Sequence, residues 1–326
     1  MSDPNTRRIL SLDGGGAKGI FQAKFLSQFV NLWGINPNEL WKHFDVICGT
    51  SVGGIQALAY STGVSPDEAM SFMLDSSPAI FSTSTIIPGI QATILDKLST
   101  MILGGSFYPP NVLQATLNSF FGSKTMADCK TNTLITSYNY DTDTPVLFSN
   151  ASFPDSSGET ELISNIALAT ASAPLYFPQA NIGGVRYIDG AMIKNNPEWL
   201  GYSLGQVVKP TANRTCILSI GCGLGNVGFH DVPTPPPDES NMSFLFRTIS
   251  IAINGTQEVD AKQMDLVDNF SLDKVYAYRA QSVFETPYGD LDNTTTEASN
   301  YRMQKSVDLF NSDISDISTF LGHLTA

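Results

Sequence analysis

Strands and helices are predicted to alternate along this 326-residue chain, and that alternation constrains the fold more than any other feature. The first predicted strand covers residues 7–13 and runs into three consecutive glycines, after which apolar residues recur at helical spacing from Ala17 to Trp33. A second strand at 44–50 leads through Ser51 into another helical pattern. Later strands are expected at 132–140, 145–150, 185–189, 215–223 and 274–280, and later helices from 66 onward and at 110–122, 163–172, 243–267 and 299–322. This order predicts a three-layer α/β/α sandwich with a mainly parallel central sheet.

The acidic net charge of the chain opposes binding to nucleic acid and to anionic lipid. The formal net charge is −13 at pH 7. Proteins that bind nucleic acid present a basic surface to its phosphates, so no nucleic-acid partner is expected. The same charge opposes electrostatic docking on anionic lipid, so a membrane contact would have to be apolar.

No pattern in the sequence predicts secretion or a membrane span. The apolar run between Arg8 and Asp13 is only ILSL, which is too short for a signal peptide, and no stretch is long and apolar enough to cross a bilayer. The four cysteines lack the spacing of a zinc site and fit reduced thiols. We therefore expect a cytoplasmic protein that contacts membranes transiently at their surface, with no metal and no cofactor.

The pentapeptide GTSVG at 49–53 lies between a predicted strand and a predicted helix. A G-x-S-x-G sequence in that context is the arrangement of a nucleophile elbow. The turn leaves no room for a Cβ at Gly49 or Gly53, and it raises the serine hydroxyl over the sheet at the positive end of the next helix. Ser51 is therefore a candidate nucleophile. The alternative is a glycine-rich turn that only closes a βα unit.

The run DGGGAKG at 13–19 occupies the same kind of junction. Consecutive glycine N–H groups at a helix N-terminus can bind an anion, either a phosphate or the oxyanion of a tetrahedral acyl intermediate. A phosphate-binding P-loop would require Ser or Thr after Lys18, where Gly19 stands. A dinucleotide site would require an acidic residue at the end of the second strand, and none is found at that distance. Because a candidate nucleophile ends the neighbouring strand, we favour an oxyanion hole.

Several residues could act as the base for Ser51. The chain has three histidines, of which His43 precedes the nucleophile, whereas His230 and His323 come late enough to match the chain order of Ser-His-Asp hydrolases on α/β sheets. Asp189, which ends the strand at 185–189 and is followed by glycine, is a further candidate, although Asp-Gly is also a routine turn. From the residues alone these alternatives stay open.

Four segments taken together resemble the patatin-like phospholipase family. They are DGGGAKG (13–19), GTSVGG (49–54), ATASAPLYFP (169–178) and DGA (189–191) with NNP close behind, and they occur in the order and spacing of that family. The resemblance implies a patatin-like fold with a catalytic core at 7–225. Because the sequence has no internal repeat and no clear linker, the C-terminal extension at 226–326 is expected to pack on the same domain.

The resemblance also implies roles for individual residues. The family uses a Ser-Asp dyad without histidine, which makes Ser51 the nucleophile and Asp189 its base. The implied oxyanion hole consists of the N–H groups of Gly14, Gly15 and Gly16, and the supporting positions are Lys18, Gly49 and Gly53. The family more often has DGG where this chain has DGA, a replacement of one small residue by another.

The implied activity is that of a calcium-independent lipid acyl hydrolase of the phospholipase A or lysophospholipase type. Its substrate would be phospholipid or lysophospholipid. Partial burial is expected to raise the pKa of Asp189 above the ordinary value of about 4, which would make the carboxylate a better base. Two alternatives remain, namely a Ser-His esterase that uses His230 or His323, and a non-catalytic lipid-binding or storage protein.

Residues 76–108 differ from the rest because small and apolar side chains are interrupted by Pro and Gly. This segment could form a lid or the wall of an acyl-chain site. Ordinary core helices are the alternative, and the periodicity slightly favours them.

Overall fold

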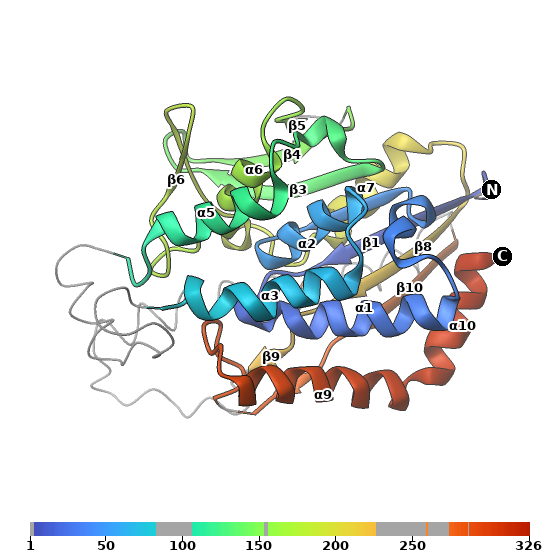
Figure 1. Cartoon of the computed structure of the whole chain (residues 1–326). Helices are drawn as coiled ribbons and strands as arrows, with labels where there is room; N and C mark the ends of the chain where they lie inside the picture. Colours follow the sequence, from blue (N-terminus) through green and yellow to red (C-terminus); the bar gives the residue numbers. More distant parts are fainter. Residues whose placement is uncertain (1–2, 83–105, 153–155, 226–258, 260–273, 286) are drawn as a thin grey trace, which may run out of the picture.

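A central sheet organises the molecule, and the computed structural model describes residues 3–82, 106–152, 156–225, 259, 274–285 and 287–326 (Figure 1). The strands follow the order β10 (Lys274–Ala280), β8 (Arg214–Ile220), β1 (Thr6–Leu12), β2 (Val46–Gly49), β3 (Asn132–Asn139), β4 (Thr144–Ser149) and β5 (Ser156–Ser157). The first five run parallel, and β4 joins β3 antiparallel. The expected mainly parallel sheet is confirmed.

Two short strands extend this sheet beside β3. β7 (Val185–Asp189) pairs antiparallel with β3 and with β6 (Ala180–Ile182). A separate parallel pair is formed by β9 (Leu224–Gly225) and β11 (Val283–Phe284). The pairing of β7 with β3 matters most for the site, because it carries the end of β7 next to the carboxyl end of the parallel strands.

Helices cover both faces of the sheet. They are α1 (Gly19–Trp33), α2 (Val52–Ser61), α3 (Pro66–Ile80), α5 (Pro110–Phe121), α6 (Ile163–Ala171), α7 (Glu198–Val208), α9 (Thr296–Ser312) and α10 (Ile314–Thr325). Short 3-10 turns lie at Gly16–Lys18, Pro37–His43, Met126–Asp128 and Gly190–Met192. Local signals explain several ends: Gly34 closes α1 in a left-handed conformation, and Ser65 begins α3 with a capping box.

Alternating strand residues divide the core into two layers. Ile9, Val46 and Ile217 pack together with Leu204 of α7 on one face. Leu10, Ile47 and Leu218 point to the other face, into the larger cluster that is shared with the remaining helices. Both faces of β1 are therefore buried, as its continuous burial shows, and this is the environment of a central parallel strand.

β10, α9 and α10, which lie beyond residue 226, pack with the rest of the molecule. β10 pairs with β8 along seven residues, and α9 packs against α1, so that the red and blue helices run side by side in Figure 1. The expected single helix at 299–322 is two helices, with a break at Asp313 (φ −100°, ψ 11°). The break turns α10 so that Phe320 packs against Tyr278 of β10. The helix expected at 243–267 lies outside the described residues, except for Val259.

Among the helices that the structure describes, none combines the length and the apolar character needed to cross a bilayer. All four cysteines are buried free thiols.

Candidate active site

Ser51 lies in a sharp turn between β2 and α2, with backbone angles φ 55° and ψ −126° that L-residues seldom adopt. The flanking glycines make this turn sterically feasible. A Cβ on Gly49 would lie 2.2 Å from the carbonyl oxygen of Gly53, and a Cβ on Gly53 would lie 2.3 Å from the carbonyl oxygen of Leu12. The turn therefore requires glycine at both positions for the reason that the sequence suggested.

The strained turn is held by hydrogen bonds from neighbouring elements. The Ser51 N–H donates to Oγ1 of Thr170 on α6 at 2.8 Å. The Thr50 hydroxyl lies 2.7 Å from Oγ1 of Thr136 and 2.7 Å from the carbonyl oxygen of Lys194. Thr170 belongs to the ATASAPLYFP segment, which resembles the family, but no role for its hydroxyl was expected. No pattern of neighbouring residues in that segment predicts that the Thr170 hydroxyl accepts a hydrogen bond from the Ser51 N–H.

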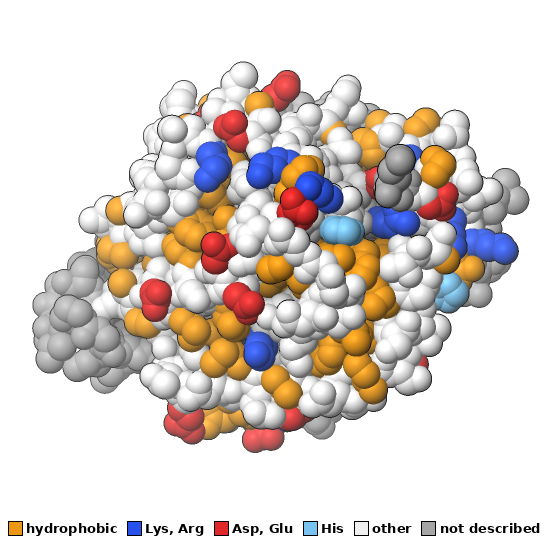
Figure 2. Space-filling view, turned by 45° about the vertical axis from the view of Figure 1, so that its right-hand side comes forward, with side chains coloured by type: hydrophobic (Ala, Val, Ile, Leu, Met, Phe, Trp, Pro, Cys, Tyr) orange, Lys and Arg blue, Asp and Glu red, His pale blue; other side chains and the backbone are white. Residues whose placement is uncertain are grey.

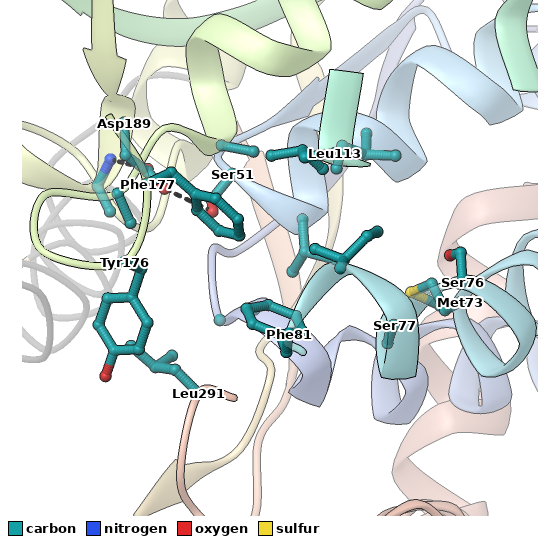
Figure 3. Close-up of a pocket in the computed structure, with 18 of the residues that line it drawn as sticks. Ser51, Met73, Ser76, Ser77, Phe81, Leu113, Tyr176, Phe177, Asp189 and Leu291 are labelled. Atoms are coloured by element: carbon teal, nitrogen blue, oxygen red, sulfur yellow. Dashed lines mark hydrogen bonds between the residues drawn. The ribbon is translucent and has the colours of Figure 1, made fainter. Parts of the chain in front are cut away.

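Asp189 ends β7 and faces Ser51 directly. The Ser51 hydroxyl donates to Oδ2 at 2.7 Å, and the Ala191 N–H donates to Oδ1 at 2.8 Å (Figure 3). The carboxyl is 2% exposed. Burial raises the pKa of Asp189 to about 7, and the two hydrogen bonds oppose that rise. A carboxylate with this pKa is a far better proton acceptor near neutral pH than an ordinary aspartate.

The glycine loop at 14–16 lies beside Ser51, and a Cβ on Gly14 would come 3.1 Å from the Cβ of Ser51. The structure changes the expected set of donors. The Gly14 N–H donates to the backbone oxygen of Asn195 at 3.0 Å, so it is already engaged. Within the described part of the chain, the N–H groups of Gly15 and Gly16 have no acceptor, and both residues line the same pocket as Ser51. The available pair is therefore Gly15 and Gly16.

Lys18 does not line the pocket, and it ties the glycine loop to the segment after β8. Its Nζ donates to the carbonyl oxygen of Gly223 at 2.9 Å. Burial lowers the pKa of Lys18 to about 8. The neighbouring Asp13 is fully buried and pairs with Arg279 of β10, whose guanidinium reaches both carboxylate oxygens. No sequence motif marks the position of Arg279, so this ion pair was not expected.

A pocket opens above Ser51, and its empty space, counted with the open mouth, is about 780 Å³. Its described lining is mostly apolar and comes mainly from α2, α3, α5 and the loop after α6, together with the glycine loop, the segment that begins at Asp189, and Leu291. In Figure 3, Tyr176 and Leu291 lie at one end of the pocket, and Met73 and Ser76 at the other. Of the segment at 76–108, residues 76, 77, 80 and 81 line this pocket. The expected lid or wall at 83–105 lies outside the described residues.

The histidines are not beside Ser51 where the structure describes them. His323 stacks on Tyr276, and its carbonyl accepts a hydrogen bond from Arg214. Arg214 begins β8, whereas Ser51 follows the carboxyl end of β2. Because these strands are parallel, His323 lies at their amino ends, away from Ser51. His43 packs against Trp33, and His230 lies outside the described residues. The part of the chain that the structure describes also holds no cluster of His, Cys, Asp and Glu suited to a metal ion.

A family model described as patatin-like phospholipase matches residues 10–200. A cGAMP-activated phospholipase of Escherichia coli is 31% identical over 203 residues, which are 60% of this chain and 54% of that protein. A cGAMP-activated phospholipase of Vibrio cholerae is 33% identical over 206 residues, which are 60% of this chain and 57% of that protein. The chain thus spans a little over half the length of these two relatives.

One solved structure with a similar arrangement is that of the human GIVD cytosolic phospholipase A2. The similarity covers 98% of this chain and 61% of that one, with a TM-score of 0.46 and 11% sequence identity.

Proposed function

The chain belongs to the patatin-like phospholipase family, and from this membership and the geometry of the site we propose that it is a lipid acyl hydrolase. The observation that carries the proposal is the 2.7 Å hydrogen bond from the Ser51 hydroxyl to Asp189, in one pocket with the N–H groups of Gly15 and Gly16, which have no acceptor among the described residues. A nucleophile, a base and an anion-binding pair are the parts that acyl transfer requires.

In the proposed reaction, Oγ of Ser51 attacks the ester carbonyl carbon while Oδ2 of Asp189 accepts its proton. The carbonyl oxygen becomes an oxyanion that the N–H groups of Gly15 and Gly16 stabilise, and each such donor contributes roughly 3–4 kcal/mol in comparable sites. The alcohol then leaves with the proton from Asp189, and the acyl group stays on Ser51. Water attacks this ester by the same route, so that fatty acid is released and both residues are restored.

We propose a phospholipid or a lysophospholipid as the substrate. The apolar lining of the pocket suits an acyl chain, because a chain that leaves water for such a lining gains hydrophobic free energy. Each step above uses only groups of the chain, the ester and water, so we expect hydrolysis to be independent of calcium. A phospholipid whose two acyl chains differ would show, from the fatty acid that is released, which position is cleaved.

We further propose that the protein reaches its substrate by transient apolar contact with a membrane surface. With a net charge of −13, the protein gains nothing from electrostatic attraction to anionic lipid. The contact is proposed at the mouth of the pocket, because its lining is apolar and can meet lipid without positive charge. Figure 2 brings forward a different side of the molecule, the one that carries the two chain termini, and hydrophobic patches between acidic and basic side chains are present there as well.

The test measures fatty-acid release from vesicles of mixed phospholipids, with labelling by a fluorophosphonate in parallel. Wild type is compared with Ser51→Ala and Asp189→Asn, each with calcium and with a chelator. Two relatives are named as cGAMP-activated, so every reaction is run with and without cGAMP. We expect wild type to release fatty acid and take up the label, and both variants to do neither.

Other outcomes separate the alternatives. Activity that survives in Ser51→Ala would contradict the proposal. Vesicle binding by wild type without hydrolysis or labelling, with and without nucleotide, would favour a lipid-binding protein.

A further inference from the structure

A loop near the end of the chain, residues 287–293 between β11 and α9, lies against the glycine loop of the site. The Ala17 N–H donates to the carbonyl oxygen of Leu291 at 2.8 Å, and the Leu291 side chain lines the pocket (Figure 3). A Cβ on Gly16, which has φ 57°, would lie 2.5 Å from that carbonyl oxygen. The Leu291 carbonyl thus accepts a hydrogen bond at the end of the glycine loop, and its close approach leaves no space for a side chain at residue 16.

Arg302 of α9 is fully buried and connects these two loops through hydrogen bonds. Its guanidinium donates to four backbone carbonyl oxygens, those of Tyr288 (3.0 Å), Asp290 (2.9 Å), Asn293 (2.7 Å) and Ala17 (3.3 Å). Three of these carbonyls belong to the 287–293 loop, and the fourth belongs to the residue that follows the glycines. One side chain therefore binds Ala17 and also Asp290 and Asn293, which lie on either side of Leu291 in the 287–293 loop.

The chemistry of arginine suits this position. A guanidinium has five N–H donors in a planar fork, whereas an ammonium has three donors on one atom and cannot reach carbonyls spread over two loops. Burial lowers the pKa of Arg302 to about 10, so the group stays charged at neutral pH. On the pocket side, the Tyr108 hydroxyl donates to Oδ2 of Asp292 at 2.6 Å and holds the 287–293 loop from a second direction.

We propose that Arg302 is a positioning residue for the oxyanion-binding N–H groups of Gly15 and Gly16, acting through Ala17 and the 287–293 loop. The inference rests on the proposed function, because it assigns a purpose to the same glycine loop. Three consecutive glycines have unusual backbone freedom, so their N–H groups need an external constraint to stay aimed at the oxyanion. A misplacement of about 1 Å in such a site costs on the order of 100-fold in rate.

The test uses the full chain and a soluble ester, p-nitrophenyl butyrate, so that vesicle binding plays no part. We compare wild type with Arg302→Met and Arg302→Lys. Arg302→Met is expected to lower kcat about 100-fold while KM stays within about twofold, because the oxyanion forms only after the substrate has bound. Arg302→Lys, which keeps the charge and some donors, is expected to restore part of the loss. Ser51→Ala gives the background.

Arg7→Met is the matched control. Arg7 is 1% exposed, and its guanidinium donates to the backbone carbonyls of Lys209 and Pro210 near the opposite edge of the sheet. This variant also removes a buried arginine from backbone carbonyls, here partly buried ones, so it is expected to lose stability, yet to keep wild-type kcat when folded. If the two arginine-to-methionine variants lower kcat equally, or if Arg302→Met keeps wild-type kcat, the proposal is overturned.

Two further measurements test the proposal if the Arg302→Met variant is too unstable to assay. Tyr108→Phe releases the 287–293 loop from its other side, and a several-fold lower kcat with unchanged KM is expected; wild-type kcat in both Tyr108→Phe and Arg302→Lys would overturn the proposal. Hydrogen exchange of the peptide that contains residues 14–18 needs no catalysis, and exchange is expected to be faster in the Arg302 variants than in Arg7→Met. Equal exchange overturns the positioning role. An inactive wild type whose exchange still depends on Arg302 would instead refute the proposed function alone.

Discussion

The hydroxyl oxygen of Ser51 lies 2.7 Å from Oδ2 of Asp189, although 138 positions separate the two residues in the chain. The second carboxylate oxygen accepts the Ala191 N–H, so the carboxyl cannot rotate without losing a buried hydrogen bond. One oxygen is thus left to receive a proton from Ser51. Because the carboxyl is also desolvated, its protonation state near neutral pH decides whether it can act as a base.

The pH dependence of hydrolysis follows from that protonation state. The pKa of Asp189 is raised from 3.8 to about 7, so the ionised form predominates only above about pH 7. We expect kcat/KM for a soluble ester to rise about tenfold per pH unit below that value and to level off above it. Initial rates from about pH 5 to pH 9 test this; a profile that is already level near pH 5 would contradict it.

Replacing Asp189 by Asn is expected to abolish activity and to stabilise the fold at neutral and higher pH. The amide can keep both hydrogen bonds, with its oxygen toward Ala191 and its NH2 toward Ser51, but it carries no charge. A carboxyl whose pKa is raised on folding favours the folded state below its unfolded pKa, and this contribution is lost as the pH rises through its folded pKa. The contribution of Asp189 to stability is therefore lost between about pH 4 and pH 7 in wild type, and the variant lacks this dependence.

Urea unfolding at several pH values measures this difference. At about 1.4 kcal/mol per pKa unit, the variant should gain on the order of 2–4 kcal/mol above pH 7 and almost nothing near pH 4. A variant that is less stable than wild type at about pH 8 would show that Asp189 stabilises the fold while ionised.

Gly53→Ala is expected to destabilise the protein and to abolish activity. The added Cβ would meet two backbone oxygens, those of Leu12 and Asp13, at 2.3 and 2.5 Å, and backbone cannot swing aside as a flexible side chain can. We expect a loss of more than about 2 kcal/mol in the free energy of unfolding. Gly322→Ala is the control: a Cβ there has no neighbour within 4 Å on the exposed face of α10, so a gain of about 0.5–1 kcal/mol is expected. Equal effects would refute the steric explanation.

Thr170→Val is expected to slow catalysis more than it changes substrate binding. The substitution keeps the shape but removes the acceptor for the Ser51 N–H, which costs about 1–3 kcal/mol when a buried donor is left unpaired. The turn at Ser51 should then relax, and kcat should fall about tenfold or more with little change in KM. Thr170→Ser keeps the hydroxyl and should restore most of the rate. A serine variant as slow as the valine variant would show that the methyl group matters instead.

The local parts of the site could be read from the sequence. The order of strands and helices follows from hydrophobic periodicity, and the turn at Ser51 follows from glycines at the two positions where a Cβ has no space. Both depend on residues only a few positions apart. The resemblance to a family paired Ser51 with Asp189 before any distance was known; their contact is now a finding, and their catalytic role stays a prediction.

Other parts of the site have no local signal. The Gly14 N–H was expected in the oxyanion hole, but it donates to Asn195, 181 positions later. Arg302 stands in an ordinary helical stretch without any motif, and its four acceptors come from two loops that the fold brings together. The break at Asp313 likewise reflects packing of α10 on β10, because the helical pattern of the sequence continues through it.

The sequence by itself thus determined the order of the elements, the strained turn at Ser51 and the family to which the chain belongs. The tertiary structure alone decided which backbone N–H groups stay unpaired, which late residues hold the glycine loop, and how far burial raises the pKa of Asp189. The division has a physical cause. Turn sterics and periodicity depend on neighbours in the chain, whereas desolvation and hydrogen-bond occupancy depend on neighbours in space, and these are set only when distant segments pack together.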